Sequence, residues 1–319
     1  MSTSLIDVPP GETVPARGPR GSRVKACWFE EDQFADALDF GLATDRDTLE
    51  QAFRLLHDQY VAQGYMDPHP SGLRLGIHNA LPSTRVFVAR SGRRVVGTMM
   101  LIVDSPLGLP MDEIYADDLR AFRDERRELT EASGLALDPD CHRSGVAVLL
   151  RIIRMITLYA AEVLRSNDIC IAVNPRHAAF YRKAFYFRDI GGLKHYGKVN
   201  GAPALALRLD CDLLRTFVSE LREGRSVPSD VYSFLYRKAN AEQALARLGE
   251  EMEQASPVAY LSYFFSRHEA WAKACLADRA HLLESYRTLA ALQTSPNLVE
   301  TLRTWNVINF ENRVGLALA

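Results

Sequence analysis

The chain contains only five cysteines in 319 residues, and these lie far apart without a C-x-x-C pair. Closely spaced cysteines form the frameworks of disulfide-rich secreted domains and of structural zinc sites. Their absence predicts reduced thiols in a cytoplasmic protein and no bound metal. The five cysteines are Cys27, Cys141, Cys170, Cys211 and Cys275.

The sequence also lacks a strong charge of either sign, because its formal net charge is −2. A nearly neutral chain has no general attraction to nucleic acid or to an anionic membrane, so any basic docking surface must be local. The most apolar segment, residues 146–165, is interrupted by Arg151 and Arg154, which argues against a membrane span. Residues 1–5 do not show the basic-then-apolar order of a secretory signal, and we expect a cytoplasmic location.

Three regions follow from composition and periodicity. Residues 1–26 are rich in proline and glycine and have almost no large apolar side chains, which predicts a disordered tail over residues 1–36. Residues 37–210 alternate between strand and helix patterns and should form one domain. Residues 211–319 are helical in period and predict an all-helical C-terminal extension.

The middle of the domain, residues 127–187, reads as a strand, a turn, a long apolar helix, a second strand and a short aromatic helix. Before it we expect a strand, a helix whose capping box pairs Thr44 with Asp47, an antiparallel pair of strands and an insertion. After it, Asn200-Gly201 predicts a closing hairpin. The expected strands are 37–42, 85–90, 95–103, 131–137, 169–173, 193–199 and 204–209, and the helices are 45–63, 146–165 and 176–185.

Two features of the domain suggest binding surfaces. The loop over residues 64–82 is long for a compact domain, so it is either a flap on the substrate side or simply packing. Arg151, Arg154 and Arg165 are spaced to share one helical face, which fits either a docking patch for an acidic partner or a solvated stripe. In addition, a helix that starts after the turn at 138–145 offers unpaired N–H groups to an anion such as a pyrophosphate.

The order of these elements is that of the GNAT acyltransferases. Four segments within this order carry a closer resemblance to one family. They are the helix end at 60–65, Gly-Leu-Pro at 108–110, the segment Arg127 to Leu137 with its Glu-x-Ser motif, and Asn-Pro-Arg-His-Ala-Ala-Phe-Tyr at 174–181. Together they resemble the long-chain N-acyl amino acid synthases, a bacterial family related to the acyl-homoserine lactone synthases. The resemblance covers about residues 39–210.

The resemblance implies an α/β (α+β) fold of the GNAT-like acyl-CoA N-acyltransferase type, with a mixed central sheet and flanking helices. It also implies an N-acyltransferase that moves a long-chain fatty acyl group from acyl carrier protein to the α-amine of an amino acid. Such an enzyme holds no permanent cofactor. Its cosubstrate is an acyl-phosphopantetheine, with acyl-coenzyme A as the alternative donor.

Three side chains are the catalytic candidates. Glu131 matches the glutamate of the family motif and would take a proton from the incoming amine, although a sheet-edge glutamate paired with an arginine would look the same. Ser133 points to the same face and would hold water or the amino acid, or else pair with a hydroxyl across the sheet. Tyr181 matches the tyrosine that acetyltransferases place near the leaving sulfur, with core packing as its alternative.

The donor arm would be held by the backbone around the same strand and by the turn that follows. An N–H near Leu135 to Leu137 is the expected donor to the thioester oxygen. Asn174 would bond the pantetheine amide, or else serve the turn at the strand end. The residues that stand where acetyltransferases carry the pyrophosphate loop are His142, Arg143, Ser144, Gly145 and Ala147.

Several rival functions remain open from sequence. The pyrophosphate loop departs from the usual pattern because His142 occupies its first position, which favours acyl carrier protein over an acetyl-coenzyme A-dependent acetyltransferase. An acyl-homoserine lactone synthase is disfavoured because Gly134 stands where those enzymes have an arginine after Glu-x-Ser. Outside the enzymes, the chain would be a regulatory module that binds acyl groups or acyl carrier protein.

Overall fold

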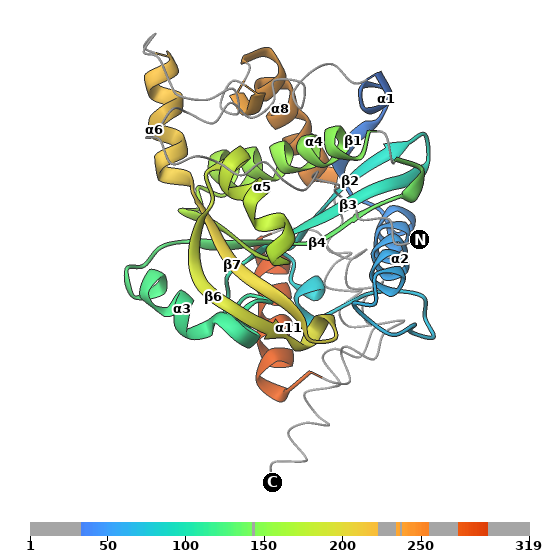
Figure 1. Ribbon diagram of the computed structural model, residues 1–319, viewed down its shortest axis with the longest axis vertical. Coiled ribbons are helices and arrows are strands. Elements are labelled where there is room, and N and C mark those ends of the chain that lie inside the picture. Colours follow the sequence, from blue (N-terminus) through green and yellow to red (C-terminus); the bar gives the residue numbers. More distant parts are fainter. Residues whose placement is uncertain (1–32, 142–143, 223–233, 237, 255–273, 293–319) are drawn as a thin grey trace, which may run out of the picture.

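The computed structural model describes residues 33–141, 144–222, 234–236, 238–254 and 274–292. Its centre is one seven-stranded sheet in the order β1-β2-β3-β4-β5-β7-β6 (Figure 1). The apolar and β-branched runs of the sequence form these strands. Their bounds are β1 Asp39–Leu42, β2 Arg85–Ser91, β3 Arg94–Val103, β4 Leu129–Leu137, β5 Asp168–Val173, β6 Arg188–Tyr196 and β7 Ala202–Asp210.

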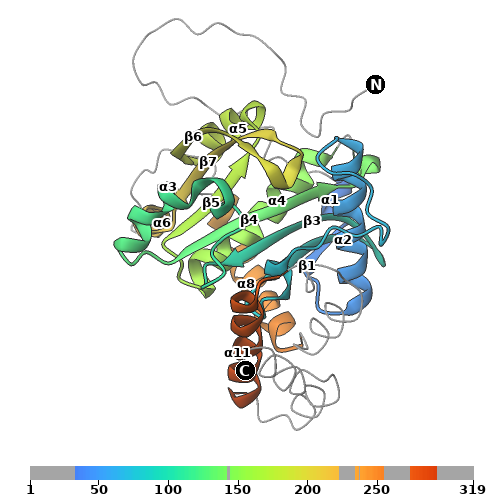
Figure 2. The ribbon, with the colours of Figure 1, turned by 90° about the horizontal axis from the view of Figure 1, so that it is seen from below.

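One pair of strands in this sheet is parallel, and it is short. β4 and β5 pair only over Leu129–Glu131 and Asp168–Cys170, whereas every other neighbouring pair is antiparallel. β3, β4 and β5 run beside one another across the middle of Figure 2. Because the pairing stops at Glu131, the remainder of β4 has no strand partner on its β5 side.

Helices cover both faces of the sheet. α4 (Gly145–Leu158), which continues as a π-turn (Tyr159–Val163), and α5 (Pro175–Phe185) share one core with the sheet, and α2 (Arg46–Ala62) and α3 (Asp112–Asp124) cover the opposite face. Strand alternation explains this division, because Leu101 belongs to the α4 core whereas Met100 and Ile102 face α2 and α3. In Figure 1, α4 lies above the central strands and α3 below them.

This architecture confirms the predicted GNAT-like fold class, and most elements lie within a few residues of their expected bounds. One local prediction is wrong: Asp45, not Thr44, caps α2, since its Oδ1 accepts a hydrogen bond from the Thr48 N–H at 2.9 Å. An aspartate cap satisfies the free N–H groups of a first turn as well as a threonine does. No helix in the described part of the chain is long and apolar enough to cross a membrane.

The described C-terminal helices pack into the same cores as the domain. They are α6 (Cys211–Arg222), α8 (Lys238–Gln254) and α11 (Leu276–Leu292). Glu251 of α8 accepts a hydrogen bond from the Leu42 N–H of β1 at 2.6 Å, and the buried Tyr286 of α11 donates to the Ala80 carbonyl at 2.8 Å. The described helices of the C-terminal region therefore complete the domain rather than stand apart from it.

The arginines of α4 do not form an open docking patch. Arg151 is ion-paired with Asp36, and Arg154 donates from Nε to the Leu235 carbonyl at 3.1 Å. Arg165 follows the helix in a left-handed conformation, with φ of 57°, and so leaves the predicted line. Arg151 and Arg154 thus contact residues distant in sequence, although both side chains stay partly exposed.

The tail boundary also shifts. Helix α1 (Gln33–Asp36) lies inside residues 1–36, which the sequence assigned to a disordered tail, and Ala35 is fully buried in the α4 core. A small residue such as Ala35 adds little to a hydrophobic pattern, so the sequence did not indicate that this segment packs on the core. Cys27 and the remainder of the predicted tail lie outside the described residues, whereas Cys141, Cys170, Cys211 and Cys275 are free thiols.

The packing of α11 makes a testable prediction. Tyr286→Ala should lower the free energy of unfolding by about 3–5 kcal/mol through loss of a buried aromatic ring. Tyr286→Phe should lower it by about 1 kcal/mol, because the bond of the hydroxyl to the Ala80 carbonyl is lost while the ring stays in the core. Chemical denaturation followed by circular dichroism measures both, and an alanine variant as stable as the wild type would show that α11 is not part of the core.

Candidate active site

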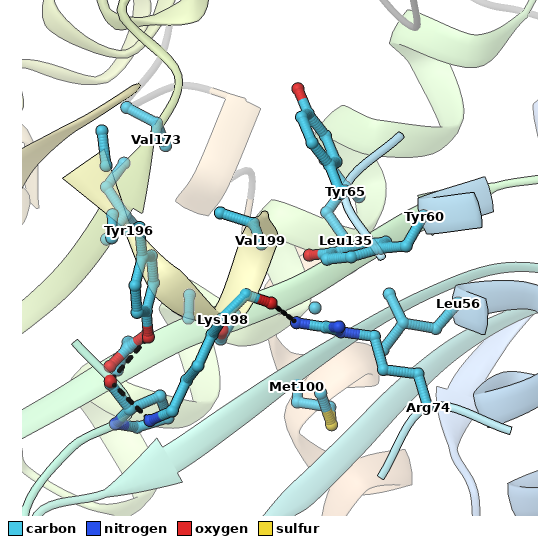
Figure 3. A pocket seen from close by; sticks show the side chains of 18 of the residues that line it. Leu56, Tyr60, Tyr65, Arg74, Met100, Leu135, Val173, Tyr196, Lys198 and Val199 are labelled. Atoms are coloured by element: carbon cyan, nitrogen blue, oxygen red, sulfur yellow. Dashed lines mark hydrogen bonds between the residues drawn. The ribbon is translucent and has the colours of Figure 1, made fainter. Parts of the chain in front are cut away.

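A cavity of about 430 Å³ opens where β4 and β5 diverge. Its walls come from α2, the loop at residues 64–82, β3, β4, β5, α5 and the β6–β7 hairpin (Figure 3). The loop was predicted to be either a flap on the substrate side or simple packing, and it has both roles. Leu73 is buried against α2, and the stretch after it lines the cavity. The site is therefore built from segments far apart in the sequence.

Glu131 is the carboxylate of this cavity. It lies on the central strand β4, it is 1% exposed, and one of its oxygens accepts a hydrogen bond from the Met111 N–H at 2.8 Å. Burial raises the pKa of Glu131 to about 7, against the lowering effects of the Met111 bond and of the charge on Lys198. Among the described residues no arginine forms an ion pair with Glu131, so the sheet-edge alternative is wrong.

Ser133 lies on the same face, one pleat further along β4. Its register partner on β3 is Met100, so it has no hydroxyl opposite it and the cross-strand alternative is wrong. A hydrogen bond from Ser133 helps to lower the pKa of Glu131 against the effect of burial. The structure therefore brings together the glutamate and the serine of the predicted motif.

Gly134 forms a bulge in β4 that shapes this wall. Thr98 pairs with Ala136 and Met100 with Ser133, so β4 has one residue more than β3 in this interval. Gly134 has φ of +66°, and a Cβ there would lie 2.3 Å from the Met100 Cε. A residue other than glycine at position 134 would therefore strain the backbone, and the flexible end of Met100 would have to move aside.

The bulge separates the two ends of the backbone segment that was predicted to bind the thioester oxygen. Leu135 lines the cavity beside the unpaired side of β4. Leu137 is buried in the α4 core and does not line the cavity, since its side chain lies 3.0 Å from where a Cβ on Gly97 would be. Only the first part of the segment Leu135 to Leu137 faces the site.

Tyr181 is both a core residue and a cavity residue. Its ring makes edge contacts with Phe180 and Phe187, at centroid distances of 5.3 and 5.6 Å, and it also lines the cavity. Burial raises the pKa of Tyr181, so the phenol keeps its proton at neutral pH. The structure thus places a proton donor in the wall formed by α5.

Asn174 ends β5 and caps α5. Its Oδ1 accepts a hydrogen bond from the Arg176 N–H at 3.2 Å, as the turn alternative predicted, and the residue also lines the cavity. Neighbouring His177 lines the cavity too. Burial and the charge of Arg176 lower the pKa of His177 to about 4, so this ring is neutral at pH 7.

The predicted phosphate-binding turn lies at the start of α4, after the end of β4. Ser144 precedes the helix and Gly145 is its first residue, and the Val148 N–H is bonded to the Ser144 carbonyl at 2.9 Å. The N–H groups before Val148 have no helical acceptor, because a helix leaves its first turn unpaired. Ser144, Gly145 and Ala147 are not among the residues that line the cavity, and His142 and Arg143 lie outside the described residues.

The cavity residues that the sequence analysis missed include Arg74, Tyr196 and Lys198. Arg74 donates to the Lys198 carbonyl at 3.0 Å, and the Tyr196 hydroxyl and the Lys198 ammonium both donate to the Pro110 carbonyl, at 2.6 and 3.0 Å (Figure 3). These contacts join residues 86 to 124 positions apart in sequence, and no local pattern signals them. The only available signal for Arg74 was the unusual length of its loop.

Comparison with known proteins identifies related chains. The family model described as N-acyl amino acid synthase FeeM matches residues 51–210. The solved structure of FeeM, an N-acyl amino acid synthase from uncultured soil microbes, is 32% identical, and the match covers 56% of this chain and 94% of that one with a TM-score of 0.49.

More distant structures also match. BjaI, a CoA-dependent acyl-homoserine lactone synthase, is 20% identical over 65% of this chain and 99% of its own, with a TM-score of 0.44. An N-acetyltransferase from Staphylococcus aureus Mu50 is 13% identical over 55% of this chain and 98% of its own, with a TM-score of 0.36. No curated protein matches the chain in sequence.

The burial of Glu131 has a measurable cost in stability. Its folded-state pKa of about 7 lies above the ordinary 4.5, so the folded state loses stability as pH rises from 4.5 through 7. Glutamine does not ionise, and Glu131→Gln should therefore be roughly 2–3 kcal/mol more stable relative to the wild type at pH 8 than at pH 5. Denaturant titrations at both pH values test this, with the exposed Glu128→Gln as control, and the same difference at both pH values would contradict it.

Proposed function

Because the chain belongs to the FeeM N-acyl amino acid synthase family, we propose that it moves a fatty acyl group from the thioester of acyl carrier protein to the α-amine of an amino acid. The chain is an N-acyltransferase; the donor and the acceptor are the parts proposed. The observation that carries the proposal is a buried carboxylate in a cavity at the divergence of β4 and β5, inside the matched region.

Glu131 is proposed as the base for the amine. An α-amine is an ammonium near neutral pH and must lose a proton before its nitrogen attacks a thioester carbonyl. A carboxylate with a pKa of about 7 is a matched acceptor for that proton. The Met111 N–H holds one carboxylate oxygen in place, and the hydroxyl of Ser133 orients the group or the incoming amine.

The remaining steps use the walls on either side. As the nitrogen–carbon bond forms, the carbonyl oxygen gains charge, and the free backbone side of β4 at Leu135 is the proposed donor to it. When the carbon–sulfur bond breaks, Tyr181 gives its proton to the leaving thiolate. Asn174, at the mouth formed by β5, supplies an amide for the pantetheine arm.

The start of α4 is the proposed site for the phosphate of the donor arm. Its unpaired N–H groups and the positive end of its dipole favour an anion beyond the end of β4. Ser144, Gly145 and Ala147 form this first turn, with His142 and Arg143 preceding it in sequence. A single phosphodiester, as acyl carrier protein offers, suits a turn that departs from the usual pyrophosphate pattern.

Gly134 argues against homoserine lactone synthase chemistry. An arginine at this position would need a left-handed backbone and would place its Cβ within 2.3 Å of Met100. The left-handed backbone at this position therefore disfavours the arginine expected after Glu-x-Ser in those enzymes. An amino acid acceptor remains the better fit.

The proposal is tested by product formation. Purified protein is mixed with palmitoyl acyl carrier protein or palmitoyl-coenzyme A and with single amino acids, and amides are sought by mass spectrometry. We expect an N-acyl amino acid, formed faster from the carrier protein. No amide with any amino acid would overturn the proposed function, and faster turnover with coenzyme A would overturn the proposed donor.

The role of Glu131 predicts a pH profile. Glu131→Gln should lower kcat by about 10²–10⁴-fold, because the amide cannot accept the ammonium proton. In the wild type, kcat/KM should rise about tenfold per pH unit below 7 and then level off, because the carboxylate with its pKa of about 7 is the base only when ionised. The control is Glu128→Gln, on the exposed end before β4, and an unchanged rate in Glu131→Gln would remove this residue from the mechanism.

A further inference from the structure

Arg74 is a cation in the cavity with no carboxylate partner among the described residues. Its guanidinium lies 4.3 Å from the centroid of the Tyr60 ring and donates to the Lys198 carbonyl at 3.0 Å (Figure 3). It also donates weakly to the Met66 sulfur at 3.5 Å. A guanidinium carries five N–H donors. These contacts orient the group without neutralising its charge.

The loop that carries Arg74 is fixed in place. The Arg74 N–H donates to the Phe53 carbonyl of α2 at 3.1 Å, and the preceding Leu73 is buried in the α2 core. The His69 N–H is bonded to the His57 ring at 3.0 Å. Because its backbone is anchored to α2, Arg74 presents a preformed cation to the cavity rather than one that must be ordered on binding.

The other charged groups of the cavity differ from Arg74. Lys198 is ion-paired with Glu113 at 3.4 Å and is also bonded to the Pro110 carbonyl. His78 is held neutral at pH 7, since burial and the charge of Lys198 lower its pKa. Glu131 is the only acidic residue in the cavity wall within the described part of the chain. The cavity thus has an unbalanced positive charge at Arg74.

Arg74 and Glu131 border the same space. Burial raises the pKa of Tyr60, Arg74 lowers it and Glu131 raises it, so both charges act on this one phenol. The same two charges act in the same directions on Tyr196, on the opposite wall. An amino acid carries an ammonium and a carboxylate on one carbon, which matches a base and a cation that line the same cavity.

We propose that Arg74 binds the α-carboxylate of the amino acid acceptor while Glu131 receives its ammonium. This inference rests on the proposed function and assigns the residue that selects amino acids over simple amines. An arginine and a carboxylate form a pair of parallel hydrogen bonds, which fixes orientation as well as affinity. Tyr60 and the Lys198 carbonyl hold the guanidinium for that contact.

The first experiment needs no variant. Wild-type protein is given its best amino acid and the corresponding amine that lacks the carboxylate, each with palmitoyl acyl carrier protein. We expect kcat/KM to be about 10–100-fold higher for the amino acid, the range that a desolvated charge-assisted pair provides. Equal kcat/KM for the two acceptors would overturn the inference while leaving acyl transfer in place.

The second experiment locates the selectivity. Arg74→Gln should raise KM for the amino acid about 10–100-fold and leave the KM values for the amine and for the acyl donor unchanged. Arg74→Lys keeps the positive charge but lacks the planar pair of N–H donors, so its KM for the amino acid should lie between those of the wild type and Arg74→Gln. Arg54→Gln is the matched control, because Arg54 reaches the same loop from α2 but is ion-paired with Glu50 at 3.3 Å and lies outside the cavity.

Each result of these measurements has a defined meaning. If both Arg74 variants lose kcat/KM equally with the amino acid and with the amine, Arg74 has a structural role and the inference is overturned. A raised KM for the acyl donor alone would place the donor phosphate, not the acceptor carboxylate, at Arg74. Wild-type protein that forms no amide at all would overturn the proposed function itself, a result distinct from either of these.

Discussion

The structure depends on how briefly β4 and β5 are paired. Three residue pairs join the strands, and the pairing ends at Glu131. Past that point the backbone of β4 has no strand partner on its β5 side, and the cavity occupies the space. A buried unpaired backbone is costly unless something fills the site. The divergence therefore creates both the room for a substrate and the polar groups that would meet it.

Keeping a carboxylate in this space requires support from outside the sheet. Glu131 is fully buried, and the Met111 N–H, at the start of α3, is its hydrogen-bond donor from the insertion between β3 and β4. That insertion also supplies the Pro110 carbonyl, which Tyr196 and Lys198 both contact. One short segment thus holds the glutamate and ties the β6–β7 hairpin to the cavity.

Opposite faces of the sheet have different tasks. The α4 face is a continuous apolar core, which α6 and α8 extend. The α2 and α3 face carries the cavity. α11 packs against this face through Leu282 and through the bond of Tyr286 to Ala80. The buried carboxylate of Glu131 weakens the folded state once it is ionised. It is tolerated because the far face and the C-terminal helices supply burial elsewhere.

The sequence by itself determined what local physics controls. Strand alternation, the helix that begins at Gly145, the cap at Asn174 and the Asn200-Gly201 turn all depend on neighbouring residues, and the structure follows them. The sequence also predicted that Glu131 and Ser133 lie on the same face of the sheet, because residues two apart on a strand share a face.

Only the tertiary structure decided the partners of distant charges. Arg151 and Arg154 were readable as exposed, but they contact residues 36 and 235. Arg74 gave no signal beyond the length of its loop, and its place beside Tyr60 and Lys198 arises when a loop and a hairpin 124 residues apart meet. The physical reason is the same in each case: periodicity reports which face of an element is apolar, whereas the identity of the neighbour across that face depends on how the whole chain is packed.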